Sequence, residues 1–449
     1  LGNAADPIDA DQKLQEDALM SYVASVNYSY GDKYYASFSF RRDGSSRLSP
    51  DTRWGNFWSL SASWRLSQEK FMQSLKSVLS DLKLRASYGV NGNLPSSYYG
   101  YQSTYTTGAF YNGKPSPWES TLGNEELTWE KNYALNLGLD IGLFSRVNVS
   151  LDWYTRTTKD LLMSKQLNSI SGFSSLLTNV GQMRNTGVEL EVRSNNIKTK
   201  DFSWTTAFNL SHNKNKILKL ADLPWFVDGR YVRKEGYPFN TIYLREYAGV
   251  DPETGSALYY DNQQDENGNY TKNKVTDPGQ ASPIPLKDIT PTISGGFMNT
   301  FNYKFIDLSF NLSYSFGGYS YDNASYILQD DGYSVISNKS TEQRRRWQKP
   351  GDITDVPRFV YGNKKGGNYN SSRAIHSTDH IRLKSLILGL NAPKAWLQKL
   401  GIGNARIYFS GTNLLTWAAY GQYDPEMSGV VGFYTPPLKT YAFGLELKF

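Results

Sequence analysis

Apolar and polar side chains alternate along many short segments of this chain. Residues 306–316, IDLSFNLSYSF, are the clearest case, because almost every second residue is large and apolar or aromatic. Residues 21–30, SYVASVNYSY, and residues 440–449, TYAFGLELKF, repeat the period. A period of two places successive side chains on opposite faces of an extended strand. The pattern predicts strands with one apolar and one polar face, which in a single strand also fits a half-buried strand of a soluble protein.

The same alternation predicts about 13 strands along the chain. We place them at residues 20–30, 33–42, 54–66, 81–91, 130–142, 146–160, 183–194, 202–212, 292–303, 305–316, 378–390, 403–413 and 439–449. Most are close to the roughly 9–11 residues that a tilted strand needs to cross a bilayer. The sequence shows almost no sustained helical period, and it lacks an apolar run of the roughly 20 residues that a membrane helix needs.

The connections between the predicted strands are either short or long. Tight polar turns surround Gly31, Ser145 and Lys304. Long loops rich in Gly, Asn, Tyr and Ser occupy residues 91–128, 213–291 and 317–377. Outer-membrane barrels have short periplasmic turns and long extracellular loops, and only a closed sheet pairs every strand's backbone in lipid. The sequence therefore predicts an all-β transmembrane barrel, with apolar side chains toward lipid and polar side chains toward a wet lumen.

The composition agrees with this prediction and argues against one class of partner, nucleic acid. The 449 residues include 33 Tyr, 21 Phe and 11 Trp, yet the mean hydropathy is polar at −0.54. The net charge of +6 is modest, and Lys and Arg are scattered, so we expect no nucleic-acid partner. The absence of cysteine excludes a disulfide framework and a thiolate metal site.

The predicted number of strands is odd, whereas single-chain bacterial barrels have an even number. If the C-terminus lies in the periplasm, the first predicted strand starts outside the cell. Residues 1–19 are then an extracellular loop segment, and residues 20–449 are the C-terminal part of a larger barrel with long extracellular loops. We expect an upstream portion of the same barrel to complete the sheet.

Ordered motifs add a family resemblance that covers essentially the whole chain. They are FRRDGSSRL, LKLRASYGVNGN, NVGQMRNTGVELEV, YAGVDPETG, RRRWQKPGDITDVPRF, HIRLKSLILGL and GTNLLTWAAYGQYDPEM. In this order they resemble the C-terminal half of the SusC-like (SusC/RagA) TonB-dependent transporters of Bacteroidetes. The resemblance implies a plugged outer-membrane barrel of about 22 strands. It places the plug and the TonB box in an N-terminal part that these residues do not contain.

The resemblance also implies a function and partners. The function is import of an oligosaccharide or oligopeptide nutrient across the outer membrane. The partners are a SusD-like surface lipoprotein that caps the barrel, TonB with its motor ExbB–ExbD, and a second copy in a dimer of SusC–SusD pairs. Two alternatives remain open: a passive barrel or receptor without TonB coupling, and a surface enzyme on a barrel scaffold.

Candidate ligand contacts lie in the aromatic loops. Aromatic rings interleaved with Asn and Gly suit stacking on sugar rings, and they suit peptide binding nearly as well. The alternative is that these rings pack loop against loop or against a lipoprotein lid. The substrate-binding candidates are Tyr98, Tyr99, Tyr101, Trp118, Trp225, Phe226, Tyr319 and Tyr321.

The search for catalytic or metal chemistry gives little, so we expect no enzyme, cofactor or metal. DENGN at 265–269 resembles a calcium loop, but Gln263 and Lys274 occupy its first and twelfth ligand positions. His376 and His380 lie at a loop-to-strand junction, where a metal site is the weaker interpretation. No nucleophile elbow of the Gly-x-Ser-x-Gly kind occurs.

Three further motifs have structural interpretations. DGSSR predicts a polar turn in which Arg47 pairs with Asp43 or Asp51. WQKPGD predicts a folded surface loop anchored by its tryptophan, with a turn set by Pro and Gly. YDPEM presents two carboxylates, Asp424 and Glu426, either to a cation or, as we favour, in a proline-centred turn.

The final strand carries one more expectation. By resemblance, an assembly machine recognises the last strand of such barrels through alternating aromatic residues and a terminal Phe. Tyr441, Phe443 and Phe449 supply that pattern here. The alternative is that Phe449 only anchors the barrel in the interfacial aromatic girdle.

Overall fold

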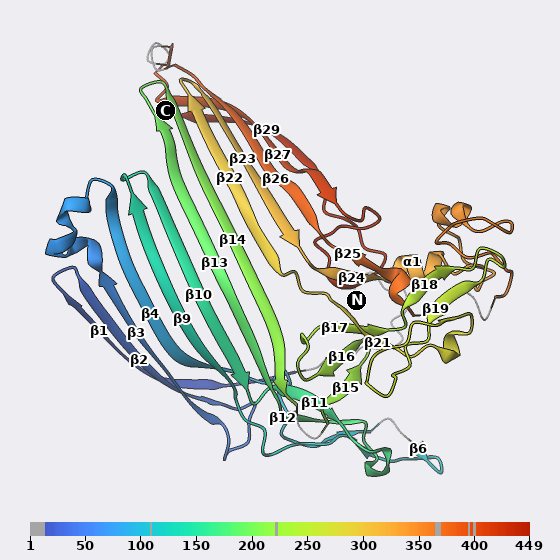
Figure 1. Cartoon of the computed structure of the whole chain (residues 1–449). Coiled ribbons are helices and arrows are strands. Elements are labelled where there is room, and N and C mark those ends of the chain that lie inside the picture. The colour runs from blue at the N-terminus through green and yellow to red at the C-terminus, as the bar shows by residue number, and fades with distance from the viewer. Residues whose placement is uncertain (1–13, 108–109, 221–222, 364–369, 394–395, 398–400) are drawn as a thin grey trace.

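The main feature of the molecule is one large antiparallel sheet. The computed structural model describes residues 14–107, 110–220, 223–363, 370–393, 396–397 and 401–449. Thirteen strands form the sheet, and each pairs with the next of them along the chain (Figure 1). They are β1 (Leu19–Tyr30), β2 (Tyr34–Ser45), β3 (Trp54–Arg65), β4 (Leu79–Asn93), β9 (Glu130–Leu143), β10 (Val147–Lys159), β13 (Gln182–Lys198), β14 (Phe202–Lys219), β22 (Ile293–Tyr303), β23 (Ile306–Phe316), β26 (His380–Asn391), β27 (Asn404–Ala418) and β29 (Thr440–Lys448). All the predicted strands are confirmed.

The register explains why the alternating sequence makes a two-faced sheet. Across five strands, neighbouring leucines pair directly in one row: Leu84, Leu139, Leu151, Leu190 and Leu210. The adjacent row, on the opposite face, contains Arg85, Gly138, Asp152, Glu189 and Ser211. No leucine of the first row is buried: Leu84 is 43% and Leu151 40% exposed, and the other three are partly exposed. An apolar face that remains uncovered in this way is the face that a barrel turns toward lipid.

Several strands are longer than the apolar pattern predicts; β27, for example, ends at Ala418 although we expected a strand at 403–413. We expected strands at 183–194 and 202–212, but β13 continues to Lys198 and β14 to Lys219. Their pairing extends to the Gln182–Lys219 pair, with a bulge beside it. This stretch of β14 includes Lys214 and Lys216, which carry charge. Backbone pairing outside the bilayer needs no apolar face, so the alternating apolar pattern ends before the strand does.

One end of the sheet carries mostly tight turns, as predicted. Gly31 and Asp32, between β1 and β2, both have positive φ, 59° and 53°. Phe144 and Ser145, between β9 and β10, both have a φ of 54°. Two successive residues with positive φ are typical of the type I′ hairpin, which matches the twist of the flanking strands. The β3–β4 connection is longer and contains the 3-10 helices η1 (Leu66–Gln68) and η2 (Lys70–Leu75).

The long loops at the other end fold into small sheets of their own. One sheet joins β15 (Trp225–Asp228), β16 (Tyr231–Lys234), β17 (Thr241–Leu244) and β21 (Ile284–Asp288). A second joins β18 (Tyr247–Val250), β19 (Ala257–Tyr260) and β20 (Lys274–Val275). A third joins β24 (Tyr319–Asp322), β25 (Ile375–Ser377) and β28 (Gly429–Val431). Smaller elements are β5 (Thr104–Thr106), β6 (Phe110–Tyr111), β7 (Lys114–Pro115), β8 (Trp118–Thr121), β11 (Leu162–Gln166), β12 (Ser175–Asn179), the helix α1 (Asn323–Leu328) and the 3-10 helices η3 (Ser169–Ser171), η4 (Pro278–Gln280), η5 (Thr341–Arg345) and η6 (Ser372–Ala374).

The two longest loops, 220–292 and 317–379, pack together as one unit. Buried Ile242 and Leu244 from the first loop contact Tyr321 and Ala374 from the second. The indole Nε1 of Trp347 donates a hydrogen bond to the carbonyl oxygen of Pro252 at 2.8 Å. The structure therefore agrees with the expectation that WQKPGD forms a loop anchored by its tryptophan, and it supplies the surface on which that tryptophan packs.

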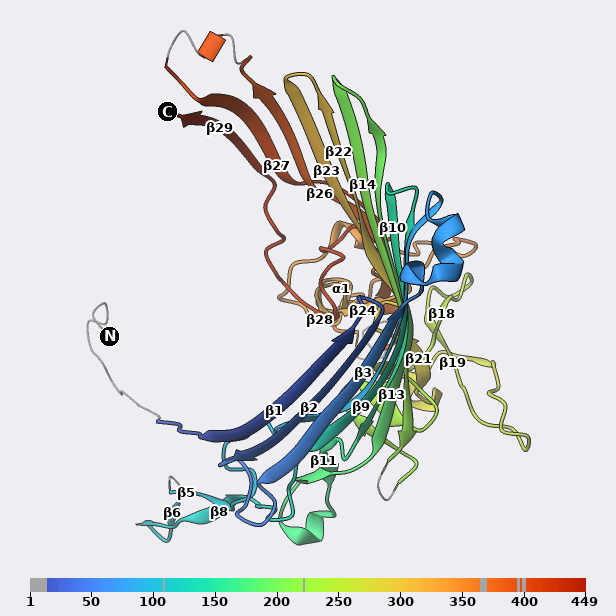
Figure 2. The same cartoon turned by 90° about the vertical axis from the view of Figure 1, so that its left-hand side faces the viewer.

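The sheet is curved, and its two outermost strands lie apart. Figure 2 shows β1 and β29 at opposite ends of an arc. Among the described residues, β1 pairs only with β2 and β29 only with β27. The helices within the described ranges are all too short or too polar to cross a membrane.

Candidate functional site

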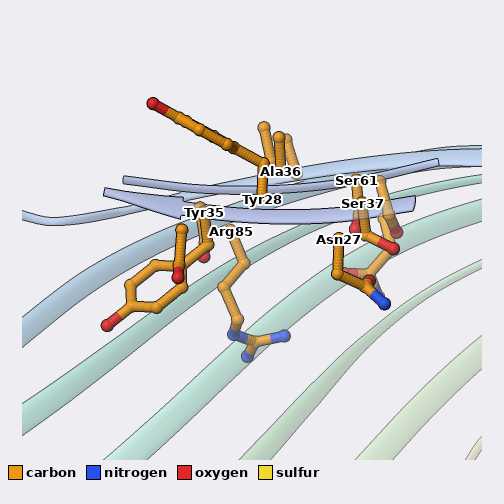
Figure 3. Close-up of a pocket in the computed structure, with 13 residues that line it drawn as sticks. Asn27, Tyr28, Tyr35, Ala36, Ser37, Ser61 and Arg85 are labelled. Carbon is orange, nitrogen blue, oxygen red and sulfur yellow. The ribbon is translucent and has the colours of Figure 1, made fainter. Parts of the chain in front are cut away.

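Small hydroxyl and amide side chains line the polar face over the first strands. Figure 3 shows Asn27, Ser37 and Ser61 on this face, while Tyr28 projects from the opposite face. They line a hollow of about 410 Å³ over β1 to β4 and β9, with Arg85 projecting into the same side. This part of the wall offers hydrogen-bonding groups to a solute while leaving room for it.

Arg85 is held by two carboxylates from neighbouring strands. Its Nε donates to Asp140 Oδ2 at 2.8 Å, and its Nη1 donates to Asp152 Oδ1 at 2.9 Å. The hydroxyl of Ser150 also donates to Asp140, at 2.8 Å. A guanidinium fixed by two charge-assisted contacts has little freedom to rotate. Arg85 therefore acts as a rigid cross-link of β4, β9 and β10 on the polar face.

A second hollow, of about 540 Å³, lies on the polar face of β9, β10, β13 and β14. The Tyr154 hydroxyl donates to Asn213 Oδ1 at 3.0 Å, and the Asn213 amide donates to Asn185 Oδ1 at 3.3 Å. Arg156 and Glu189 also line the hollow and are exposed, and neither forms an ion pair within the described residues. This hollow suits a polar solute. The sequence analysis sought ligand contacts in the aromatic loops and did not predict this hollow, although the alternation placed these side chains toward the lumen.

Tyr98 and Tyr99 lie near the sheet, where Tyr98 contacts an arginine. The guanidinium of Arg47 is 4.2 Å from the centre of the Tyr98 ring, and the two tyrosine rings are 6.4 Å apart. Arg47 pairs with Asp17 at 2.9 Å. The predicted pairing of Arg47 with Asp43 or Asp51 is therefore wrong, because Arg41 already pairs with Asp43 at 2.7 Å.

Tyr101 and Trp118 lie in the 94–129 loop. The Tyr101 hydroxyl accepts a hydrogen bond from Gln102 Nε2 at 2.9 Å. Trp118, in β8, is 61% exposed. Trp118 is therefore open to a ligand or a partner, whereas Tyr101 is half-buried.

Trp225 and Phe226 are consecutive residues of β15 and point to opposite faces of it. Phe226 packs against the buried cluster that contains Leu161 and Ile217. Trp225 is 45% exposed and lies 6.0 Å, centre to centre, from the Tyr243 ring. Of the pair, Trp225 is placed to contact a ligand and Phe226 to anchor the loop.

Tyr319 and Tyr321 lie on the short strand β24 and differ in exposure. Tyr319 is half-buried, with Lys287 Nζ 5.0 Å from the centre of its ring. Tyr321 is only 1% exposed, its hydroxyl donates to Asn370 Oδ1 at 2.7 Å, and Arg230 covers its ring. The surroundings of Tyr321 favour the loop-packing alternative for this residue.

The predicted candidates are thus spread over several loops, and one of them, Trp225, lines a hollow formed by the described residues. That hollow, within loop 220–292, has a volume of about 470 Å³. It brings Trp225 together with two tyrosines, Tyr243 and Tyr270, and with a lysine, Lys234. Their sequence separation and the absence of any motif explain why the sequence did not group them.

Acidic and histidine residues in the loops make internal contacts. Arg382, only 2% exposed, pairs with Asp424 at 2.6 Å and with Glu426 at 3.0 Å. Asp265 accepts hydrogen bonds from the backbone nitrogens of Asn267 and Asn269, as in a polar turn. Within the described ranges, His, Cys, Asp and Glu form no group of three that is placed to hold a metal ion.

Two loop groups have shifted pKa values for which burial is the largest cause. Burial raises the pKa of Asp331, although Arg373 pairs with it at 2.5 Å and opposes the shift. Burial lowers the pKa of His376, whose ring stacks on Tyr420 at a centre-to-centre distance of 3.7 Å. Both groups contribute to packing within the loops.

The final strand leaves its apolar side chains uncovered. Tyr441 is 62% exposed, Phe443 81% and Phe449 87%. Tyr441 and Phe443 contact the ring of Phe409 on β27, at 6.3 and 5.3 Å. Their part in assembly stays a prediction.

Comparisons with known proteins agree with this architecture. A family model described as TonB dependent receptor-like, beta-barrel matches residues 2–281. TonB-dependent receptor P3 of Formosa agariphila is 33% identical over 97% of this chain and 46% of its own length. TonB-dependent receptor SusC of Bacteroides thetaiotaomicron is 30% identical over 98% of this chain and 45% of its own length. The solved structure of the RagAB peptide transporter has a TM-score of 0.88 and 31% identity, over 96% of this chain and 48% of that one. The chain spans about half the length of the curated relatives it matches.

Proposed function

The chain belongs to the family of TonB-dependent receptor-like β-barrels, and from this premise we propose that it works in the import of an oligosaccharide or oligopeptide nutrient. Members of this family lie in the outer membrane, and so does this chain. The observation that carries the proposal is the sheet's polar face, where two hollows are lined by amide, hydroxyl and charged side chains. A wall of this kind guides polar solutes that are too large for general porins.

The two outermost strands need partners in lipid. Unpaired backbone groups cost several kcal/mol each, on the order of 2–7 kcal/mol, in an apolar medium. The outer edges of β1 and β29 therefore require further strands. We propose that an upstream portion of the same barrel supplies them, and that TonB and ExbB–ExbD act through a plug in that portion.

The folded loops support a surface partner. Ile353 and Tyr361, in loop 317–379, are 97% and 79% exposed. Both side chains are therefore accessible to a partner protein. We propose that a SusD-like lipoprotein covers the loops and closes the transporter over its substrate.

Uptake by living cells tests the proposal. A strain that lacks the complete gene is compared with its parent for growth on mixed oligosaccharides and on mixed oligopeptides as the only carbon source. We expect growth to be lost on one of the two mixtures and restored by the gene, and we expect a protonophore to stop uptake. Uptake that persists without the proton gradient would favour the passive-barrel alternative, and conversion of the substrate by the purified complex would favour the enzyme.

A further inference from the structure

The hollow within loop 220–292 is built by that loop alone. Its volume is about 470 Å³, within the roughly 300–1,000 Å³ of small-molecule sites. The described residues that line it come from β15, β16, β17, the connection between β19 and β20, and β21 with the segment just before it. They are Trp225, Val232, Lys234, Tyr243, Asn262, Gln263, Gln264, Tyr270, Ser282, Pro283 and Pro285. Because all belong to one loop, the site does not depend on the rest of the barrel for its walls. We call it the loop cavity.

Two aromatic rings form one side of the loop cavity. The rings of Trp225 and Tyr243 are 6.0 Å apart and tilted by 49° to each other. Trp225 keeps 45% of its surface exposed, although its neighbour in sequence is packed inward. The exposed ring of Trp225 can stack on an apolar ligand surface, and the Tyr243 ring, tilted to it, forms a wall beside that surface.

Polar groups surround these rings. Lys234 is the direct cross-strand partner of Trp225 in the β15–β16 pair. The two side chains therefore project from the same face of these strands. The Gln263 amide donates to Ser282 Oγ at 3.1 Å, which fixes its orientation. Asn262 Oδ1 accepts a hydrogen bond from Lys272 Nζ at 3.0 Å, which fixes the orientation of the amide. The loop cavity thus combines aromatic rings with amide side chains whose orientation is fixed by hydrogen bonds within the loop.

The charge on the described lining of the loop cavity is positive. Among the described lining residues, Lys234 is the only charged side chain, and none is a carboxylate. Lys234 contacts the ring of Tyr237 at 5.0 Å and forms no ion pair within the part of the chain that the structure describes. A cationic ligand therefore lacks a counter-charge here, whereas an anionic ligand finds one.

We propose that the loop cavity binds an acidic saccharide unit, with the sugar ring on Trp225 and its carboxylate or sulfate on Lys234. A sugar ring has an apolar C–H face and a rim of hydroxyls, which the rings and the amides match. A charge-assisted contact from Lys234 adds selectivity for the acidic group. The inference rests on the proposed function and names the substrate class for this site.

A peptide fits the same walls less well. Peptides that bind in an extended form add a strand, using backbone N–H and C=O groups of the host. Two lining residues, Pro283 and Pro285, lack the N–H group. The ammonium group of a free peptide N-terminus also has no lining carboxylate to contact.

Calorimetry on the purified complete transporter tests the proposal. The probes are a tetrasaccharide of galacturonic acid, a sulfated galactose tetrasaccharide, a neutral galactose tetrasaccharide and tetra-alanine. We expect an acidic saccharide to bind most tightly. Lys234→Gln should weaken binding of that acidic saccharide by at least about tenfold and leave the neutral one nearly unchanged. Trp225→Ala should weaken both saccharides.

Matched controls use residues that do not line the loop cavity. Trp396→Ala removes another exposed tryptophan, in the β26–β27 connection, and Lys114→Gln removes another exposed lysine, in β7. Neither should change binding. If tetra-alanine binds and depends on Trp225, the ligand is a peptide and the proposal is wrong. It is also wrong if neither acidic probe binds, or if Lys234→Gln weakens acidic and neutral saccharides equally.

Uptake separates this inference from the proposed function. If both loop variants import the nutrient at the wild-type rate, the loop cavity is not a substrate site, while the transporter proposal stands. If the wild-type protein supports no uptake, the transporter proposal itself fails. Folding of the variants is checked by comparing their melting temperatures with that of the parent protein.

Discussion

The sheet and the extracellular loops of this chain are stabilised in opposite ways. In the sheet, apolar side chains on the outer face stay exposed, as Leu84 (43%) and Phe443 (81%) show. In the loops, Ile242 and Tyr321 are each only 1% exposed and belong to the same buried apolar cluster. The sheet therefore leaves its apolar surface for lipid, whereas the loops bury part of theirs in small cores, as a soluble domain does, and leave other residues such as Ile353 exposed.

Charged groups follow the same division. Arg85, on the polar face of the sheet, keeps 32% of its side chain exposed while it bridges two carboxylates. In the loops, Asp331 is completely buried, and its partner Arg373 is only 13% exposed. A buried ion pair costs much to break, because one unpaired charge then remains in a medium of low polarity. The loops thus form a folded unit that is stabilised by buried contacts within the unit.

The largest expected effect concerns assembly of the sheet. We expect that a few polar residues added after Phe449 will sharply lower the amount of protein in the outer membrane. The physical reason is strand addition, because the last strand offers an unpaired backbone edge and alternating side chains to an assembly factor. Surface labelling of intact cells measures the amount.

Refolding separates assembly from stability in that experiment. The added residues leave the Phe449 ring in place, so we expect the extended protein to melt normally when it is refolded in detergent. Normal surface abundance of the extended protein in cells would reject the assembly role. Phe449 would then be an interfacial anchor only.

The next effect should fall on the loops and spare the sheet. Arg373→Met leaves Asp331 buried without its partner, which we expect to cost about 3–5 kcal/mol of loop stability. Limited proteolysis should cut loop 317–379 of the variant much faster than in the parent. The sheet, measured by its melting temperature in detergent, should change little.

A matched substitution in the same loop controls for loss of an arginine. Arg345 pairs with Asp355 at 2.6 Å, but their side chains are 59% and 71% exposed. An exposed pair contributes only about 0–1 kcal/mol, so Arg345→Met should leave proteolysis almost unchanged. Equal sensitivity of the two variants would contradict the distinction between buried and exposed pairs.

The sequence predicted the sheet well because one local rule governs it. Alternation alone located all of the strands and their two faces, since lipid and lumen impose a period of two on every residue. It missed the outer end of β14 and the opposite end of β13, beside the short turn between the two strands. The loops obey no such period, so neither their small sheets nor the pairing of Arg47 with Asp17 followed from the local sequence.

The candidate site shows the same limit. Aromatic composition named Trp225 and Tyr321 alike as substrate-binding candidates and could not distinguish the ring that lines a hollow from the ring that is buried. Lys234 joins Trp225 only through the β15–β16 pairing, and Tyr270 joins them through loop folding. Such contacts depend on long-range packing, which a single sequence does not display.

A substitution in the sheet tests which face meets lipid. Leu312→Arg, on the apolar face of β23, should cost roughly 2–4 kcal/mol if it lies near the bilayer midplane. Ser309→Arg, on the polar face of the same strand, should cost much less. Reversible unfolding in lipid vesicles measures both. Equal losses would overturn the assignment of the two faces, and with it the contrast between sheet and loops.

The smallest expected effect is a pH dependence confined to the loops. The ring of His376 lies parallel to that of Tyr420, tilted by only 3°, and the Tyr420 hydroxyl donates to Asp322 Oδ2 at 3.1 Å. Burial lowers the pKa of His376 below its usual value, and the charge of Asp322 opposes the shift. The unfolded loop therefore binds a proton more readily than the folded loop. Stability contributed by neutral His376 is complete above about pH 6.5 and is lost as the pH falls through and below that value.

Proteolysis of the 419–439 loop at pH 7.5 and pH 5.5 checks this expectation. The parent protein should be cut faster at the lower pH, while the sheet resists at both. His376→Phe keeps an aromatic ring for the stack but cannot take up a proton, so it should remove most of the difference. If the variant is as sensitive to pH as the parent, another group controls this loop. If the sheet loosens together with the loop, the two regions do not unfold separately, and the contrast drawn from their packing fails.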